Sequence, residues 1–351
     1  MSDVLRSLVS GEPPDRSHTW RQVWERLNTH NLDRAWAAAL LSTLATRLPG
    51  PDVLRPLLDS LTERHHTGEE QWPGTVNIVG TGGGPHTVNV STAAAVVAAS
   101  TGVPVVKTGS RAYQSVLGSY DLVEQLGIPL TVSRGQTHDA LDQWGLAFAG
   151  PFVYPSELSR LARLLAPTSL RPFGRFLNTL GPFLSNLPVS AQVTGVSTEF
   201  PVDTVRALAA GGCPDTVWIC HNELGADELL GFVDNVVHVS APPNEDRETV
   251  IARGSLVAAE GTLEDLAPVD PDTAVPHFLD ILAGQTNAAI AHTVRLNAAA
   301  LAVASGHTPD WRDALRAART TMEGGQARAL VERMRATAPS GGPTSTAVAH
   351  A

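Results

Sequence analysis

The sequence predicts an α/β protein, in which a small N-terminal helical subdomain precedes a larger α/β domain with a mainly parallel central sheet. Two observations lead to this prediction. Residues 1–68 carry apolar side chains at three- and four-residue spacing, whereas short β-branched segments alternate with helical stretches after Pro73. The 351 residues are 43% hydrophobic and 17% charged, which supplies enough apolar material for one large domain or two ordinary ones.

Helical spacing of apolar residues marks the N-terminal elements at residues 20–27, 32–48 and 53–65. They place the helical subdomain at residues 1–70. The segment 167–190 is rich in Pro, Phe and Leu, and we expect it to cross between the subdomains, where part of it could join the helical one.

The α/β domain is predicted over residues 71–336. Its strands are expected where β-branched residues gather, at 76–80, 103–107, 146–150, 216–220 and 235–240. Long helices are expected at 286–305 and 327–337. The tail, residues 337–351, is small and polar and is predicted to be disordered.

Charge and composition exclude several classes of protein. With 25 basic and 35 acidic residues the net charge is −10, which disfavours a strongly basic nucleic-acid binder. Cys213 and Cys220 are too few for a disulfide scaffold. No apolar run approaches the ~18 residues of a membrane helix, and the N-terminus does not resemble a signal peptide. We therefore expect a soluble, cytoplasmic protein without a membrane partner.

A glycine loop follows the first predicted strand. Residues 80–87 read Gly-Thr-Gly-Gly-Gly-Pro-His-Thr, and Ser91 and Thr92 stand where the next helix should begin. Glycines let backbone N–H groups approach a ligand, and a helix N-terminus with hydroxyls favours an anion. A structural turn followed by an ordinary helix cap is the alternative. The spacing matches neither the P-loop nor the dinucleotide-binding pattern, so another kind of phosphate loop is predicted.

Lys107 ends the second predicted strand, at the edge where open α/β sheets bind ligands. Arg111, Ser115 and Ser119 follow in a polar turn. A solvated basic turn is the alternative for either cation taken singly. Two donor-rich loops in succession favour a phosphorylated ligand.

An Asp-Glu pair, Asp227 and Glu228, follows the strand predicted at 216–220. Such a dipeptide is most often a solvated helix start. Its place after a strand of the sheet makes a role in ligand binding equally reasonable.

Taken together, these blocks resemble the anthranilate phosphoribosyltransferase family, which shares a fold with the pyrimidine nucleoside phosphorylases. The resemblance rests on an ordered series that covers residues 20–336: 80–83, 87–92, 107–121, 178–182, 227–228 and 296–299. It implies a homodimer formed through the helical subdomain, which the apolar stripes of residues 35–62 permit.

The resemblance also implies a set of site residues. Phosphoribosyl pyrophosphate is expected to bind Gly80, Gly82, Gly83, Thr87, Asn89, Ser91, Thr92, Lys107, Arg111, Ser115 and Ser119. Mg²⁺ is expected on Ser91, Asp227 and Glu228, because hard cations prefer carboxylate and hydroxyl oxygens. The implied reaction displaces pyrophosphate from ribose C1, with Lys107, Asp227 and Glu228 as the catalytic residues and no covalent enzyme nucleophile.

The sequence departs from the family where the acceptor should bind. Gly84 replaces the usual Asp, Thr108-Gly109-Ser110 replaces His-Gly-Asn, and Tyr154 replaces the His of a His-Pro block. The candidate acceptor-facing residues are Thr108, Ser110, Tyr154, Arg171 and Arg175, and His86 or Tyr113 could also touch an acceptor. These changes predict a phosphoribosyltransferase whose small acceptor is aromatic or heterocyclic and is not anthranilate itself.

Two other functions stay open. The first is a pyrimidine-type nucleoside phosphorylase, which the acidic pair disfavours because a lone phosphate ion does not require a metal. The second is a non-catalytic relative that binds a nucleotide or nucleic acid, for which Gly84 is the support and the net charge of −10 the counter-argument.

Overall fold

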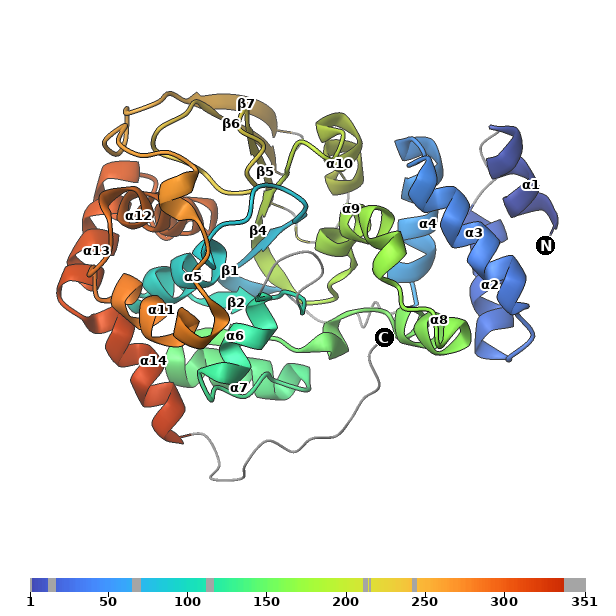
Figure 1. The fold of residues 1–351 in the computed structure, drawn as a ribbon, viewed down its shortest axis with the longest axis horizontal. Helices are drawn as coiled ribbons and strands as arrows, with labels where there is room; N and C mark the ends of the chain where they lie inside the picture. Colours follow the sequence, from blue (N-terminus) through green and yellow to red (C-terminus); the bar gives the residue numbers. More distant parts are fainter. Residues whose placement is uncertain are drawn as a thin grey trace.

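The computed structural model describes residues 2–11, 17–64, 71–111, 117–210, 214, 216–241 and 245–337. A seven-stranded sheet covered by helices lies beside a group of helices from the N-terminal part of the chain (Figure 1). The mixed α/β architecture with N-terminal helices confirms the predicted fold class.

The sheet has the strand order β3-β2-β1-β4-β5-β6-β7. Its strands are β1 (Trp72–Gly80), β2 (Val105–Lys107), β3 (Leu146–Phe148), β4 (Val189–Gly195), β5 (Thr216–Asn222), β6 (Asn235–Ala241) and β7 (Glu245–Ile251). Strands β3 to β5 in this order are parallel, and β6 and β7 continue the sheet antiparallel. From β1 the chain continues to β2 and β3 on one side of β1, and it then returns to β4 on the other side. The boundary between β1 and β4 is therefore a topological switch point, the place where open α/β sheets generally bind ligands.

Helices on the sheet form the larger core. They are α5 (Val90–Ser100), α6 (Ser119–Gln125), α11 (Ala274–Leu282), α12 (Ala288–Ala304), α13 (Trp311–Glu323) and α14 (Gln326–Thr337). Helix α7 (Arg134–Trp144) adds the partly buried Trp144 to this core, whereas α10 (Val202–Ala209) packs against β5 and α4. Helix α5 is buried along nearly its whole length and packs against α12. Its sequence of Ala and Val explains this placement, because small apolar side chains let a helix pack closely on every side.

The helical subdomain has a core of its own. It contains α1 (Ser2–Ser10), α2 (Ser17–Asn28), α3 (Arg34–Thr46) and α4 (Pro51–Thr62), joined by α8 (Ser156–Leu165) and α9 (Gly174–Leu184) from the middle of the chain. Trp20, Leu54 and Leu180 are fully buried in this core. Figure 1 shows these helices at one end of the molecule, with α11–α14 at the other. Phe183 of α9 packs against both this core and a smaller cluster formed by α10, β5 and the segment after β4.

The structure contains two strands that the sequence analysis did not predict. Strand β4 reads VSAQVTG, in which Ser, Ala and Gln interrupt the β-branched pattern although every residue but Ser190 is buried. Strand β7 is an exposed edge strand of mainly charged residues. Neither carries the apolar run that marks a buried strand, so tertiary pairing decided both.

In the described part of the chain, no helix is long and apolar enough to cross a membrane. The predicted disordered tail lies outside the described residues except for Thr337, the last residue of α14. The homodimer and the cytoplasmic location stay predictions.

Candidate active site

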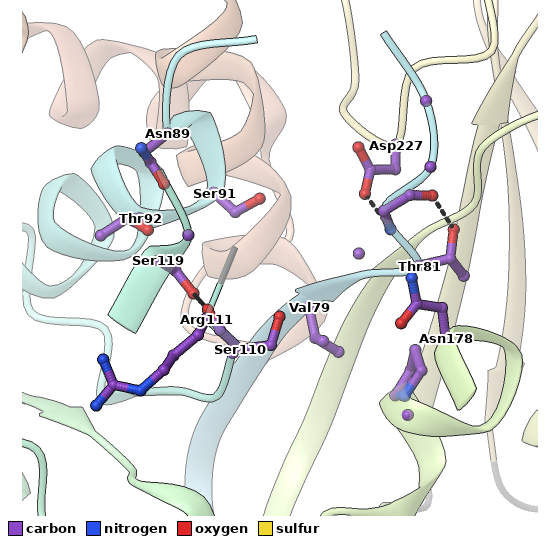
Figure 2. Close-up of a pocket in the computed structure, with 18 of the residues that line it drawn as sticks. Val79, Thr81, Asn89, Ser91, Thr92, Ser110, Arg111, Ser119, Asn178 and Asp227 are labelled. Atoms are coloured by element: carbon purple, nitrogen blue, oxygen red, sulfur yellow. Dashed lines mark hydrogen bonds between the residues drawn. The ribbon is translucent and has the colours of Figure 1, made fainter. Parts of the chain in front are cut away.

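A pocket of about 360 Å³ lies where the ends of β1 and β2 meet the loop after β5 and helix α9. Figure 2 shows Asn89, Ser91 and Thr92 on one side of this central pocket and Thr81 and Asp227 on the other. The described residues that line it are 79–92, 107, 109–111, 117–119, 154, 158, 170, 177, 178, 181, 182, 184, 227 and 228. The glycine loop, the turn after Lys107 and the acidic pair thus share one pocket.

The glycine loop begins where β1 ends. Gly82 and Gly83 have φ angles of +64° and +77°, a left-handed conformation that favours glycine. The N–H of Gly82 donates to Asp227 Oδ2 at 2.9 Å, and Ser197 Oγ donates to the Gly82 carbonyl at 2.8 Å. The loop is therefore held from two sides before it reaches the N-terminus of α5, where Asn89 is the cap residue.

Two glycines allow Asp227 to approach the sheet. A Cβ on Gly80 would lie 2.0 Å from Asp227 Oδ2, and a Cβ on Gly195 would lie 1.7 Å from the Asp227 carbonyl oxygen. Neither position can accept a side chain unless Asp227 moves. The absence of side chains at the ends of β1 and β4 is what places this carboxylate in the pocket.

Buried asparagines hold the acidic pair from behind. Asn222 Nδ2 donates to the carbonyls of Ala226 at 3.2 Å and Glu228 at 2.9 Å. Asn297, on α12, accepts from the N–H of Leu229 at 3.1 Å and donates to its carbonyl at 2.9 Å. These paired bonds fix the backbone on both sides of Glu228, so the sequence block around Asn297 serves to position the loop.

Glu228 is a buried carboxylate with one satisfied oxygen. Thr87 Oγ1 donates to its Oε1 at 2.7 Å, while Oε2 has no hydrogen-bond partner among the described residues. Burial, followed by repulsion from Asp227, raises the pKa of Glu228 well above its ordinary value. Burial also raises the pKa of Asp227, against the opposing effects of the Gly82 N–H and Lys107. The pair is therefore suited to a cation that would neutralise it.

Lys107 is 5% exposed at the end of β2. Burial lowers its pKa to about 8, and the negative charge of Asp227 partly opposes this effect. Its ammonium group donates to the Thr108 carbonyl at 2.6 Å. An ammonium group carries three protons, so Lys107 retains donors for an anion in the pocket.

Arg111 lines the pocket, but its guanidinium is engaged elsewhere. It contacts both oxygens of Glu124, at 2.7 and 2.8 Å, and Asp121 Oδ1 at 3.2 Å. Figure 2 shows its side chain directed away from Asp227. A phosphate contact of Arg111, as predicted from the sequence, would require these ion pairs to open.

The side of the pocket near α8 and α9 is more apolar. Leu158, Leu170 and Leu177 line it together with Tyr154, whose hydroxyl donates to the Gly109 carbonyl at 3.1 Å. Burial raises the pKa of Tyr154 to about 12, so the phenol is neutral near pH 7. Ser110 also lines the pocket.

Several predicted residues do not line the pocket. Thr108 is 1% exposed and bonds to Asn77 inside the sheet. Arg171 and Arg175 are exposed, and Arg175 Nη2 donates to the Glu199 carbonyl at 3.3 Å. Neither arginine is among the described residues that line the pocket. Ser115 and Tyr113 lie outside the described residues.

Asn178, Ser197 and Gly195 contribute to the site but were not predicted as site residues, although residues 178–182 form one block of the resemblance. The elements that bring them to the site are distant in the chain. One overlooked signal was present in the sequence. Lys107 is the only lysine in a chain with 25 basic residues. An arginine stays charged and has no compact ammonium group, so it cannot replace lysine where such a group is needed. The only lysine of the chain therefore indicates a position with a specific chemical role.

Comparison with known proteins supports the same reading of the chain. A family model described as "Glycosyl transferase family, a/b domain" matches residues 73–328. An anthranilate phosphoribosyltransferase from Thermus thermophilus is 30% identical over 335 residues, 94% of this chain and 98% of its own. One from Bacillus licheniformis is 27% identical over 340 residues, 95% of this chain and 98% of its own.

Solved structures agree in fold. The crystal structure of the enzyme from Thermus thermophilus has a TM-score of 0.76 and 27% identity, covering 95% of this chain and 98% of that one. The enzyme from Saccharomyces cerevisiae in complex with PRPP and Mg has a TM-score of 0.76 at 20% identity, covering 95% and 96%. These relatives all carry the anthranilate name, so the expectation of a different acceptor is not borne out.

Proposed function

The chain belongs to the glycosyl transferase family that includes the anthranilate phosphoribosyltransferases, and on this premise we propose that it transfers 5-phosphoribosyl from phosphoribosyl pyrophosphate to an aromatic acceptor. The observation that supports the proposal most is the central pocket itself. It brings together the glycine loop, the N-terminus of α5, the buried Lys107, the buried Glu228 and the half-buried Asp227 around a single space. This combination suits a diphosphate ester together with a divalent cation.

The residues present fit Mg²⁺. Glu228 Oε2 is buried without a partner, and the raised pKa values of both carboxyl groups show how unfavourable their charges are without a cation. Among the described residues, no cluster of three acidic, His or Cys side chains could hold a metal alone. Mg²⁺ commonly uses one or two carboxylates and takes its other oxygens from water and substrate phosphates. Asp227, Glu228 and the hydroxyl of Ser91 would hold it, and bound there it would neutralise charge on the departing pyrophosphate.

The remaining work in the transfer is positioning and electrostatics. Lys107 adds positive charge on the proposed phosphate side, and the glycine loop and the N-terminus of α5 line the same region. Cys220 is buried outside the pocket, and burial raises the pKa of its thiol to about 12. A covalent step through Cys220 therefore has no support, and direct attack by the acceptor on ribose C1 is the mechanism that the site suits.

The acceptor side suits a planar ring against the leucines. Anthranilate is the first compound to test, since the relatives bear its name. Its carboxylate would meet the hydroxyl of Ser110 and the amide of Asn178, because the described lining there includes no guanidinium apart from the paired Arg111. Comparing anthranilate with 2-aminobenzamide, its uncharged amide, would measure how much the site uses that charge.

Calorimetry with phosphoribosyl pyrophosphate tests the donor site. The wild-type protein should bind it with a Mg²⁺ requirement, and Glu228→Gln should weaken the Mg²⁺-dependent binding at least tenfold, roughly the effect of disturbing a metal site. Glu223→Gln changes an exposed glutamate of the same loop and should leave binding unchanged. No heat from the wild-type protein at millimolar ligand would overturn the proposal. Pyrophosphate release with acceptor then measures transfer, whereas phosphate-dependent cleavage of a nucleoside would indicate a phosphorylase.

A further inference from the structure

Three polar side chains lie inside the sheet, behind the central pocket. Asn77 on β1, Thr108 after β2 and Gln192 on β4 are 0%, 1% and 1% exposed. Asn77 pairs with Gln192 in the register of β1 and β4, so the two side chains are direct neighbours. None of the three lines the pocket.

Asn77 and Thr108 are joined by several hydrogen bonds. The backbone N–H of Thr108 donates to Asn77 Oδ1 at 3.1 Å, and Asn77 Nδ2 donates to Thr108 Oγ1 at 3.0 Å. The hydroxyl of Thr108 also lies 3.1 Å from Asn77 Oδ1. This amide therefore orients the peptide that follows Lys107.

Gln192 continues the chain of bonds to α9. Asn77 Nδ2 donates to Gln192 Oε1 at 3.1 Å. Gln192 Nε2 donates to the Pro182 carbonyl and to Thr194 Oγ1, both at 3.0 Å. Pro182 lies in the last turn of α9, where carbonyls lack helical partners, so Gln192 satisfies a group that would otherwise be unpaired.

Each end of this chain of bonds reaches a wall of the pocket. At one end, the Thr108 carbonyl accepts from the ammonium of Lys107. At the other, Pro182 lines the pocket beside Asn178 and Gly181 on α9. The bonds thus run from the wall expected to hold the donor to the wall expected to face the acceptor.

Apolar side chains could occupy these three buried positions of the sheet without needing hydrogen-bond partners. A buried amide is unfavourable unless its donors and acceptors are paired, and a fully paired network is rigid. Here every polar atom named above has a partner at 3.1 Å or less. A rigid polar link between two walls of a site has a use that packing alone does not explain, because transfer requires fixed distances between the reacting groups.

We propose that Asn77, Thr108 and Gln192 are positioning residues that hold Lys107 and α9 in fixed relation across the pocket. The expected effect on donor binding and transfer rests on the proposed function, whereas the positioning role itself does not. Its structural content is that a change at Gln192, which does not contact Lys107 and does not itself line the pocket, alters the surroundings of Lys107 through Asn77.

The single lysine permits a direct test. Protein labelled with ¹³C-lysine gives one side-chain signal set, that of Lys107. We would compare Gln192→Met, Thr108→Val and Thr108→Ser with the wild-type protein at one fixed pH, measuring the Lys107 Cε resonance and the affinity for phosphoribosyl pyrophosphate with Mg²⁺. Thr75→Val is the matched control, since Thr75 is a 5% exposed hydroxyl two residues before Asn77 that bonds to the Trp72 carbonyl at 2.6 Å.

Gln192→Met and Thr108→Val should shift the Lys107 resonance and weaken donor binding about tenfold, in line with the effect of small misplacements in a site. Thr108→Ser keeps the hydroxyl, so its Lys107 resonance and its donor affinity should equal those of the wild-type protein. Thr75→Val should lower the melting temperature as much as Gln192→Met does but should change neither the resonance nor the affinity. An unchanged Lys107 resonance in Gln192→Met would overturn the proposal. If the wild-type protein does not bind the donor, the proposed function is wrong. The Lys107 resonance in Gln192→Met then still tests the positioning role, because it is measured without the donor.

Discussion

Replacing Lys107 with methionine should make the free protein more stable while removing its affinity for the donor. The side chain is 5% exposed, and burial lowers its pKa from 10.5 to about 8. The difference of 2.5 corresponds to about 3 kcal/mol, at about 1.4 kcal/mol for each factor of ten in proton affinity. Methionine has a similar length and no charge to bury, so the mutation removes this unfavourable contribution.

The full amount will not be gained, because the charge of Lys107 also favours the ionised form of Asp227. We expect Lys107→Met to raise the free energy of unfolding by about 1–3 kcal/mol near neutral pH. The penalty is fully present below the folded pKa of about 8, where lysine is charged in both states. It shrinks between about 8 and the unfolded value of 10.5, where only the unfolded chain binds the proton, and vanishes above it.

Urea unfolding of wild-type and Lys107→Met protein at a series of pH values measures this difference. Because the chain has no other lysine, no second ammonium group of this kind titrates in the same window. Arg253→Met, at an exposed cation, should leave the stability unchanged within about 0.5 kcal/mol. A variant that is less stable than the wild-type protein at neutral pH, or a difference that does not change with pH, would refute the reasoning.

Two further predictions concern the glycines around the acidic pair. Gly80→Ala should abolish Mg²⁺-dependent donor binding in calorimetry, because its Cβ would lie 2.0 Å from Asp227 Oδ2. Gly135→Ala is the control, since Gly135 lies outside the pocket and its Cβ would come no nearer than 4.0 Å to Ser133 Oγ; equal binding by the two variants would contradict the prediction. Gly84→Asp, which installs the residue usual in the family, should lower the melting temperature by several degrees and reduce rather than improve donor binding. Its Cβ would lie 2.6 Å from the Gly225 carbonyl, so an active, stable Gly84→Asp protein would show that the loop can adopt another path.

Local pattern in the sequence was sufficient to find most of the pocket wall that we propose binds the donor. Residues 80–92 and Lys107 each follow a strand, and a loop at the carboxyl end of a parallel strand must lie at the ligand edge of the sheet. The acidic pair could be placed in the same way. These features are encoded within a few residues of one another, and sheet topology then brings them together.

Other features depend on segments that only packing brings together. Arg111 is predicted from its neighbours to face phosphate, but Glu124 on α6 holds its guanidinium. Thr108 stands where the family has an acceptor-facing residue, yet it turns into the sheet because Asn77 on the adjacent strand offers a buried partner. No spacing rule along the chain could anticipate either contact.

The sequence by itself therefore determined the fold class, the glycine loop, the turn after Lys107 and the acidic pair, since each is a pattern of neighbouring residues with its own physical meaning. Only the tertiary structure decided that Asn297 holds the Glu228 loop, that glycines at the ends of β1 and β4 admit Asp227, and that α9 forms the opposite wall. Those contacts join residues far apart in the chain. Whether two such residues meet is decided by the packing of the whole sheet and its helices.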